Sequence, residues 1–124
     1  MFYVDDNQFA NLIDRAFDTL PKAHRKAVRN VAIVYADDPT PEQREQLHLA
    51  CNETLYGLYE GVPLSKRQGV TNQYPPDKIT IFKGPLQRDA MDLHDLQVKI
   101  HHTLWHEVAH YFGLDHAQIH KLEN

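Results

Sequence analysis

One stretch of this chain decides how its fold is interpreted, and it reads His106-Glu107-Val108-Ala109-His110-Tyr111-Phe112-Gly113-Leu114-Asp115-His116. Its pattern is H-E-x-x-H-x-x-G-x-x-H. Residues four apart on a helix project from one face, so His106 and His110 can present two imidazoles to one ion. Gly113 tolerates the positive φ of a sharp helix end, and that turn lets His116 return as a third ligand. Three protein ligands leave a fourth position open, which is typical of catalytic zinc sites.

Glu107 directly follows the first histidine of this motif. It is too close in sequence to join the same row of ligands, but it is well placed to hold a water on the metal. The extended pattern is much more specific than H-E-x-x-H alone. In a plainer alternative, the helix ends in surface histidines and Gly113 is an ordinary C-cap. We predict metal ligation by His106, His110 and His116, with Glu107 as the catalytic residue.

The composition is that of an ordinary soluble domain. The 124 residues suit one domain spanning 1–124, and 42% hydrophobic with 24% charged residues is typical of globular proteins. The net charge of −4 lacks the basic excess of a nucleic-acid binder, so we expect no nucleic-acid partner. Cys51 is the one cysteine, which agrees with a reducing compartment, and no signal peptide or membrane-length apolar run is visible. We expect a cytoplasmic protein without membrane contact, and the sequence leaves its oligomeric state open.

Helix and strand patterns are interspersed along the chain, which predicts an α+β domain. A first helix should start at a cap on Asp6 or Asn7 and end near Leu20, before Pro21. The run 31–35 predicts a strand in which both faces are apolar. We further expect strands at 55–60 and 78–82, helices at 41–51 and 117–121, and a surface loop at 65–77.

The motif lies at the end of a long predicted helix, from about Asp92 to Phe112. A helix that is apolar nearly all round is a buried one, and the remaining sector of this helix carries His106 and His110. We therefore predict a central buried helix whose histidines face a cleft, packed with other helices on a small sheet of three to four strands. The apolar residues of one face are Leu93, Leu96, Ile100, Leu104, Val108 and Tyr111, and those of the other side are Trp105, Ala109 and Phe112.

From about Asn30 onward, the chain resembles the small bacterial zincin-like metallopeptidases, which are single-domain, minimal zincins. The resemblance rests on LYEGVPLSKR at 58–67, PDKITIF at 76–82 and HEVAHYFG at 106–113. It implies an α+β zincin core with very short connections. Members of that family often have Asp at the third ligand position, where this chain has His116 preceded by Asp115. We favour His116, because imidazole suits zinc and the spacing equals that of the metzincins.

The mechanism implied by this resemblance is metal-assisted hydrolysis of peptide bonds, with Zn²⁺ as the cofactor. The histidines bind the ion as neutral imidazoles, and the ion lowers the pKa of its water toward ~7. Glu107 accepts the proton of that water and later delivers it to the leaving amine. A peptide or unfolded polypeptide substrate could pair with an exposed edge of the sheet. Candidates for the oxyanion stabiliser are Tyr111, His120, Tyr74 and Arg67.

Two other functions stay open. The pattern H-x-x-x-H-x-x-G-x-D-H also resembles the motif of the bacterial rRNA-maturation endoribonucleases. That family lacks a Glu after the first His, whereas this chain has Glu107, and the acidic balance argues against RNA. The third possibility is a non-catalytic metal- or partner-binding module that has kept the fold. An intact Glu107 argues against that module.

Several other residues with reactive side chains have ordinary structural interpretations. Glu60 and Arg67 are expected to form an ion pair or to line the substrate cleft. Tyr56 and Tyr59 fall on opposite faces of their predicted strand, so at most one of them faces the cleft. Cys51 is expected in the core. Histidines expected at the surface are His94, His101, His102 and His120.

Overall fold

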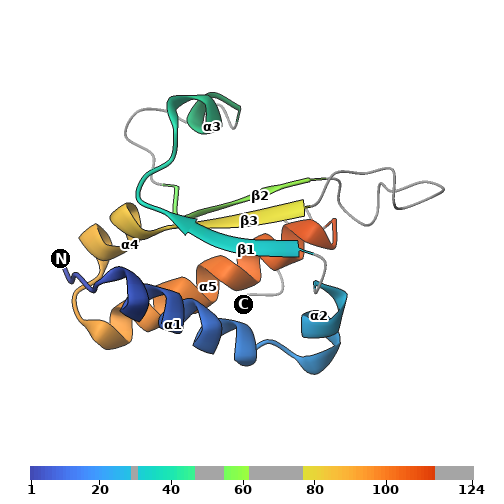
Figure 1. The fold of residues 1–124 in the computed structure, drawn as a ribbon, viewed down its shortest axis with the longest axis horizontal. Coiled ribbons are helices and arrows are strands. Elements are labelled where there is room, and N and C mark those ends of the chain that lie inside the picture. The colour runs from blue at the N-terminus through green and yellow to red at the C-terminus, as the bar shows by residue number, and fades with distance from the viewer. Residues whose placement is uncertain (29–30, 47–54, 62–76, 114–124) are drawn as a thin grey trace.

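The structure, a computed structural model, describes residues 1–28, 31–46, 55–61 and 77–113. In this part of the chain, a sheet of three strands lies against a layer of helices (Figure 1). The predicted α+β class is confirmed, and each strand lies where the sequence pattern placed it. The elements in chain order are α1 (Asp6–Asp18), α2 (Lys22–Ala27), β1 (Val31–Ala36), α3 (Pro41–Gln46), β2 (Gly57–Glu60), β3 (Asp77–Phe82), α4 (Lys83–Asp89) and α5 (Leu93–Tyr111).

The sheet is mixed, and β3 is its central strand in the order β1-β3-β2. β1 runs parallel to β3, whereas β2 runs antiparallel to it. Ile79 and Ile81 of β3 are fully buried, but Val34 and Tyr35 of β1 are 39% and 37% exposed. The predicted strand is present, but its apolar residues are not buried throughout. β1 pairs with β3 alone among the described strands, so it forms an edge of the sheet.

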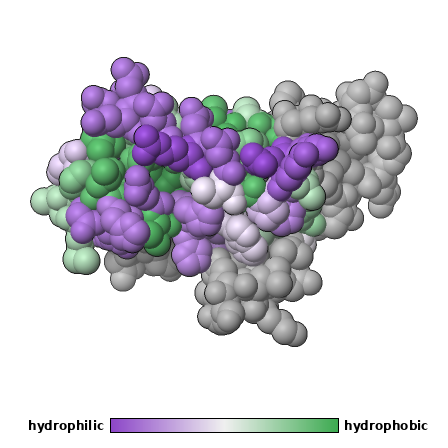
Figure 2. Space-filling view, turned by 90° about the horizontal axis from the view of Figure 1, so that it is seen from below, coloured by the Kyte–Doolittle hydropathy of each residue, from purple (hydrophilic) through white to green (hydrophobic). Residues whose placement is uncertain are grey.

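α1 and α5 pack on each other beneath one face of the sheet (Figure 1). α5 contacts β2 and β3, and the ring of Phe9 in α1 meets that of Tyr35 in β1 at a centroid distance of 5.6 Å. The outer surface of the molecule, seen from below, is mainly hydrophilic with apolar residues between (Figure 2). The core lies between helices and sheet and contains Phe9, Leu12, Ile13, Ala16, Leu20, Val28, Val31, Ile79, Ile81, Leu86, Ala90, Leu96, Ile100, Leu104, Val108 and Tyr111.

α5 carries the motif and crosses the domain beneath the sheet (Figure 1). It begins after Asp92, whose side chain caps the first turn. The predicted central, buried helix that carries the motif is confirmed, although Leu93 and Val98 in its N-terminal part are 44% and 47% exposed. One side of α5 is buried along the length of the helix, as its apolar residues at helical spacing require. The fully buried residues on that side are Leu96, Ile100 and Leu104.

The shorter helices depart from the sequence prediction. Asp5, rather than Asp6 or Asn7, is the N-cap of α1, and it forms a capping box with Gln8. The six-residue α2 and the seven-residue α4 were not predicted. Pro85 lies in the first turn of α4, where its missing N–H has no helical partner to lose. The predicted helix at 117–121, most of the predicted loop, and the second half of the helix at 41–51 lie outside the described residues.

No helix in the described part of the chain is both long enough and apolar enough to cross a membrane.

Leu104→Ala should lower the free energy of unfolding by about 2–5 kcal/mol, because it removes a fully buried side chain and leaves a cavity in the core. Val98→Ala on the exposed side of the same helix is the matched control, and it should change that free energy by less than about 0.5 kcal/mol. Urea unfolding followed by circular dichroism measures both. Equal losses in the two variants would contradict the assignment of the buried side of α5.

Candidate metal centre

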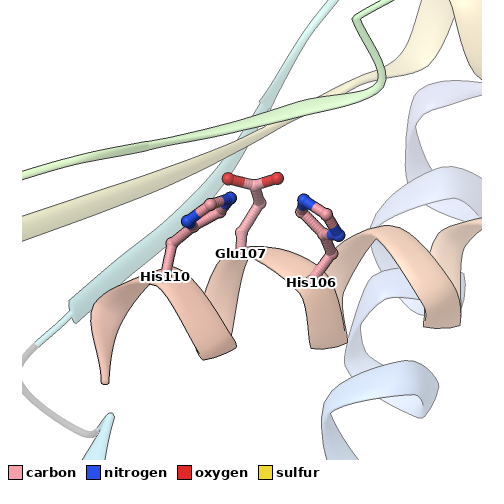
Figure 3. A group of neighbouring side chains, drawn as sticks. All are labelled: His106, Glu107 and His110. Atoms are coloured by element: carbon pink, nitrogen blue, oxygen red, sulfur yellow. The ribbon is translucent and has the colours of Figure 1, made fainter. Parts of the chain in front are cut away.

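His106 and His110 project from one side of α5 toward the sheet, one helical turn apart (Figure 3). Their ring centroids are 4.8 Å apart, and both residues are half-buried. Together with Glu107, they offer ligand atoms that all lie within 4.8 Å of one another, so the group could hold a metal ion. The spacing of the motif therefore brings the two imidazoles together as predicted.

Gly113 ends the helix in the way that the motif predicts. Its φ is 88°, and its N–H donates to the carbonyl of His110 at 2.9 Å. This left-handed conformation favours glycine and turns the chain away from the helix axis. His116 and Asp115 lie outside the described residues, so the third ligand stays a prediction.

The carboxylate of Glu107 is buried between α5 and β2. The residue is 7% exposed, and its Oε1 accepts the backbone N–H of Tyr59 at 2.9 Å. Burial raises the pKa of Glu107 from 4.5 to about 7, and the hydrogen bond from Tyr59 opposes that rise. A carboxyl group with a pKa near neutrality can both accept and release a proton under ordinary conditions.

Tyr59 anchors β2 beside the C-terminal half of α5. Its hydroxyl donates to Oδ2 of Asp77 at 2.9 Å, and its ring meets that of Tyr111 edge-on at a centroid distance of 5.9 Å. Tyr56 precedes β2, and its hydroxyl donates to Asp89. Burial, and then Asp89, raise the pKa of Tyr56 to about 12. Tyr59, rather than Tyr56, therefore belongs to the surroundings of Glu107.

The other candidate residues lie in ordinary environments or outside the described part of the chain. Glu60 has its carboxylate 3.8 Å from the Nζ atom of Lys78, so it has an ionic partner other than the predicted Arg67. The histidines of α5 that are exposed, as expected, are His94, His101 and His102. The candidates that lie outside the described residues are Arg67, His120, Tyr74 and Cys51.

The donor set fits a divalent metal ion. Imidazole nitrogens and a carboxylate are the ligands that zinc and similar first-row metals prefer. His106 and His110 are close enough to share one ion, and the buried carboxylate of Glu107 would gain a cationic neighbour. The sequence did not indicate the N–H of Tyr59, because a backbone donor is present at every residue except proline and leaves no signature.

In the metal-free protein, Glu107 should make stability fall as the pH rises from about 4.5 to about 7. Its pKa is raised from 4.5 to about 7, so between these values the folded state binds more protons than the unfolded chain. The stabilisation is complete below the lower value and lost above the higher one, a difference of about 3 kcal/mol. Glu107→Gln keeps an acceptor for Tyr59 but does not titrate.

Urea unfolding of both proteins with a chelator present measures this effect as the difference between them at each pH. The difference between the two free energies of unfolding should change by about 3 kcal/mol between about pH 4.5 and about pH 7. A difference that stays constant with pH would contradict the raised pKa of Glu107.

Comparison with known proteins identifies the family of this chain and a structure of similar fold. The sequence profile of the zincin-like metallopeptidases matches residues 28–124. A solved structure of a conserved hypothetical protein from Thermus thermophilus is similar in fold, with a TM-score of 0.59 and 18% identity over 88% of this chain and 94% of that chain. No curated protein matches. Because the profile spans most of the chain and the entire motif, this chain belongs to the zincin-like metallopeptidase family.

Proposed function

We propose that this chain is a zinc-dependent metallopeptidase that hydrolyses peptide bonds in extended or unfolded polypeptides. One observation carries the proposal: Glu107 is buried beside two imidazoles of its own helix, and a backbone N–H already holds one of its oxygens. An isolated buried carboxylate is costly, so its burial needs a compensating partner. A divalent cation held by His106 and His110 would be that partner.

We assign His106, His110 and His116 as the metal ligands. The first two lie on one side of α5, and the third follows the turn at Gly113. Each must be a neutral imidazole to ligate, so affinity should weaken below about pH 6. When bound, zinc polarises the scissile carbonyl and lowers the pKa of the attacking water toward ~7.

Glu107 acts as the proton carrier. Because its Oε1 accepts the N–H of Tyr59, Oε2 is the oxygen that accepts the proton of the attacking water. The water oxygen bonds to the carbonyl carbon, the C–N bond breaks, and Glu107 delivers the proton to the leaving nitrogen. A pKa near neutrality matches both halves of this task.

The sheet edge beside the site supports the proposed substrate class. β2 pairs with β3 alone among the described strands, and its outer edge lies next to Glu107. An extended peptide can add to such an edge through backbone hydrogen bonds, which give affinity with weak side-chain preference. The net charge of −4 disfavours a polyanion such as RNA. The single cysteine agrees with action in the cytoplasm.

The purified protein should bind one Zn²⁺ per chain, and His106→Ala or His110→Ala should abolish tight binding because each removes a ligand. His94→Ala, which changes an exposed histidine of the same helix, is the matched control and should keep the metal. Elemental analysis after dialysis gives the stoichiometry. If both ligand variants still bind one zinc per chain, the assignment of His106 and His110 as metal ligands is wrong.

The same measurement separates the two candidates for the third ligand. His116→Ala should weaken zinc binding more than Asp115→Ala does. Asp115→Asn should cost roughly 10–100-fold, the size expected of a residue that orients a ligand without binding the metal. The reverse ranking would favour the carboxylate as the ligand.

Glu107→Gln should keep the zinc and the fold but lower kcat/KM on an unfolded peptide library by about 10²–10⁴-fold, because an amide cannot take the proton of the water. Wild-type protein in the same assay with RNA added as competitor should lose no activity. Loss of zinc together with activity would make Glu107 a ligand instead. If the protein cleaves RNA but no peptide, the ribonuclease alternative is favoured. If it binds zinc but cleaves neither RNA nor peptides, a non-catalytic binding module is favoured.

A further inference from the structure

Gly57, the first residue of β2, lies closer to α5 than any side chain would allow. A Cβ atom at this position would lie 2.6 Å from Cγ2 of Thr103, 3.2 Å from the carbonyl oxygen of Thr80 and 3.3 Å from Cγ of Glu107. Its φ is not in the left-handed region, so the constraint on Gly57 is space rather than backbone conformation. The absence of a side chain at Gly57 therefore sets how closely β2 approaches the helix.

The two α5 residues that a Cβ atom at Gly57 would meet are one helical turn apart. Thr103 and Glu107 are four residues apart, so they share the side of the helix that faces β2. Thr103 is 8% exposed, and its hydroxyl donates to the carbonyl of Lys99 at 2.7 Å. The methyl group of Thr103 is thus directed at the strand, with little freedom to move away from it.

The same approach of the strand fixes Glu107. The carbonyl of Tyr56 accepts the N–H of Phe82 in β3, so the backbone groups of Gly57 and Tyr59 face the opposite, outer edge of β2. There the N–H of Tyr59 donates to Oε1 of Glu107 at 2.9 Å. A hydrogen bond to a carboxylate is short and strong, and it weakens steeply if the donor retreats.

We propose that Gly57 is a positioning residue for Glu107: its missing side chain lets β2 approach α5, so that the Tyr59 N–H holds the carboxylate beside His106 and His110. The catalytic consequence rests on the function proposed above. A general base must lie within hydrogen-bond reach of the proton it abstracts, and small displacements from that geometry reduce the rate. A free glutamate side chain has several rotamers, of which this contact selects one.

The direct readout is the backbone amide of Tyr59, observed by NMR and by hydrogen exchange without any substrate. Glu107→Ala supplies the reference spectrum for an amide that has lost its acceptor. In Gly57→Ala, the Tyr59 amide should move toward that reference and exchange at least about 10-fold faster, because the hydrogen bond protects it. Leu58→Ala, a buried change on the opposite face of the same strand, is the control and should leave the Tyr59 amide near its wild-type position.

Activity and metal binding separate positioning from general loss of structure. Gly57→Ala should keep one zinc per chain and lower kcat about 10–100-fold with little change in KM. Thr103→Ser removes Cγ2 but keeps the hydroxyl, so Gly57→Ala combined with Thr103→Ser should regain much of the lost kcat and return the Tyr59 amide toward its wild-type position.

An unchanged Tyr59 amide in Gly57→Ala would overturn the proposal, as would a failure of Thr103→Ser to restore it. If Gly57→Ala alone does not fold, the combined variant decides: a folded protein with a wild-type Tyr59 amide supports the steric account, and an unfolded one overturns it. If the amide responds as expected while the wild-type protein hydrolyses no peptide, the positioning stands and the proposed peptidase function fails.

Discussion

The contact between β2 and α5 is the constraint on which the site depends. The periodicity of α5 brings His106 and His110 to one side of the helix. By itself, however, α5 can neither bury the side chain of Glu107 nor fix the position of its carboxylate. β2 does both, because Gly57 admits the close approach and the N–H of Tyr59 lies 2.9 Å from the carboxylate. β2 is in turn held by its antiparallel pairing to the buried central strand β3. The position of one side chain therefore depends on the order of the whole sheet.

Burial gives the site its chemical character and also makes the metal-free state less stable. A carboxylate that is 7% exposed loses hydration, and one backbone hydrogen bond compensates for part of that loss. The pKa of Glu107 is raised because this compensation for the lost hydration is incomplete. A cation beside His106 and His110 would favour the charged form, so metal binding and folding stability should be coupled. The burial that suits Glu107 to its proposed role therefore also lowers the stability of the metal-free protein above about pH 7.

The parts of the fold that were predictable from sequence are those specified locally. The long helix α5 and the three strands each carry their own periodic pattern, and all are present. The order of the strands is not specified locally. The apolar residues of β1 identify a strand but not its place in the sheet, and among the described strands β3 is central and β1 lies at an edge. α2 and α4 are too short to show a helical pattern, and helices of that length depend on tertiary packing for stability.

The same distinction explains which parts of the site were predictable. His106, Glu107 and His110 lie on one helix, so their spacing determines their arrangement. The N–H of Tyr59 comes from a strand 48 residues earlier and has no side-chain identity by which a sequence could reveal it. An unpaired strand edge invites pairing with any other strand. At β2, Glu107 already accepts the outward N–H of Tyr59, and that N–H cannot also donate to a substrate carbonyl. In the binding mode proposed above, while Glu107 is held in this way, the register of a peptide on β2 would be set by the other backbone groups of the edge.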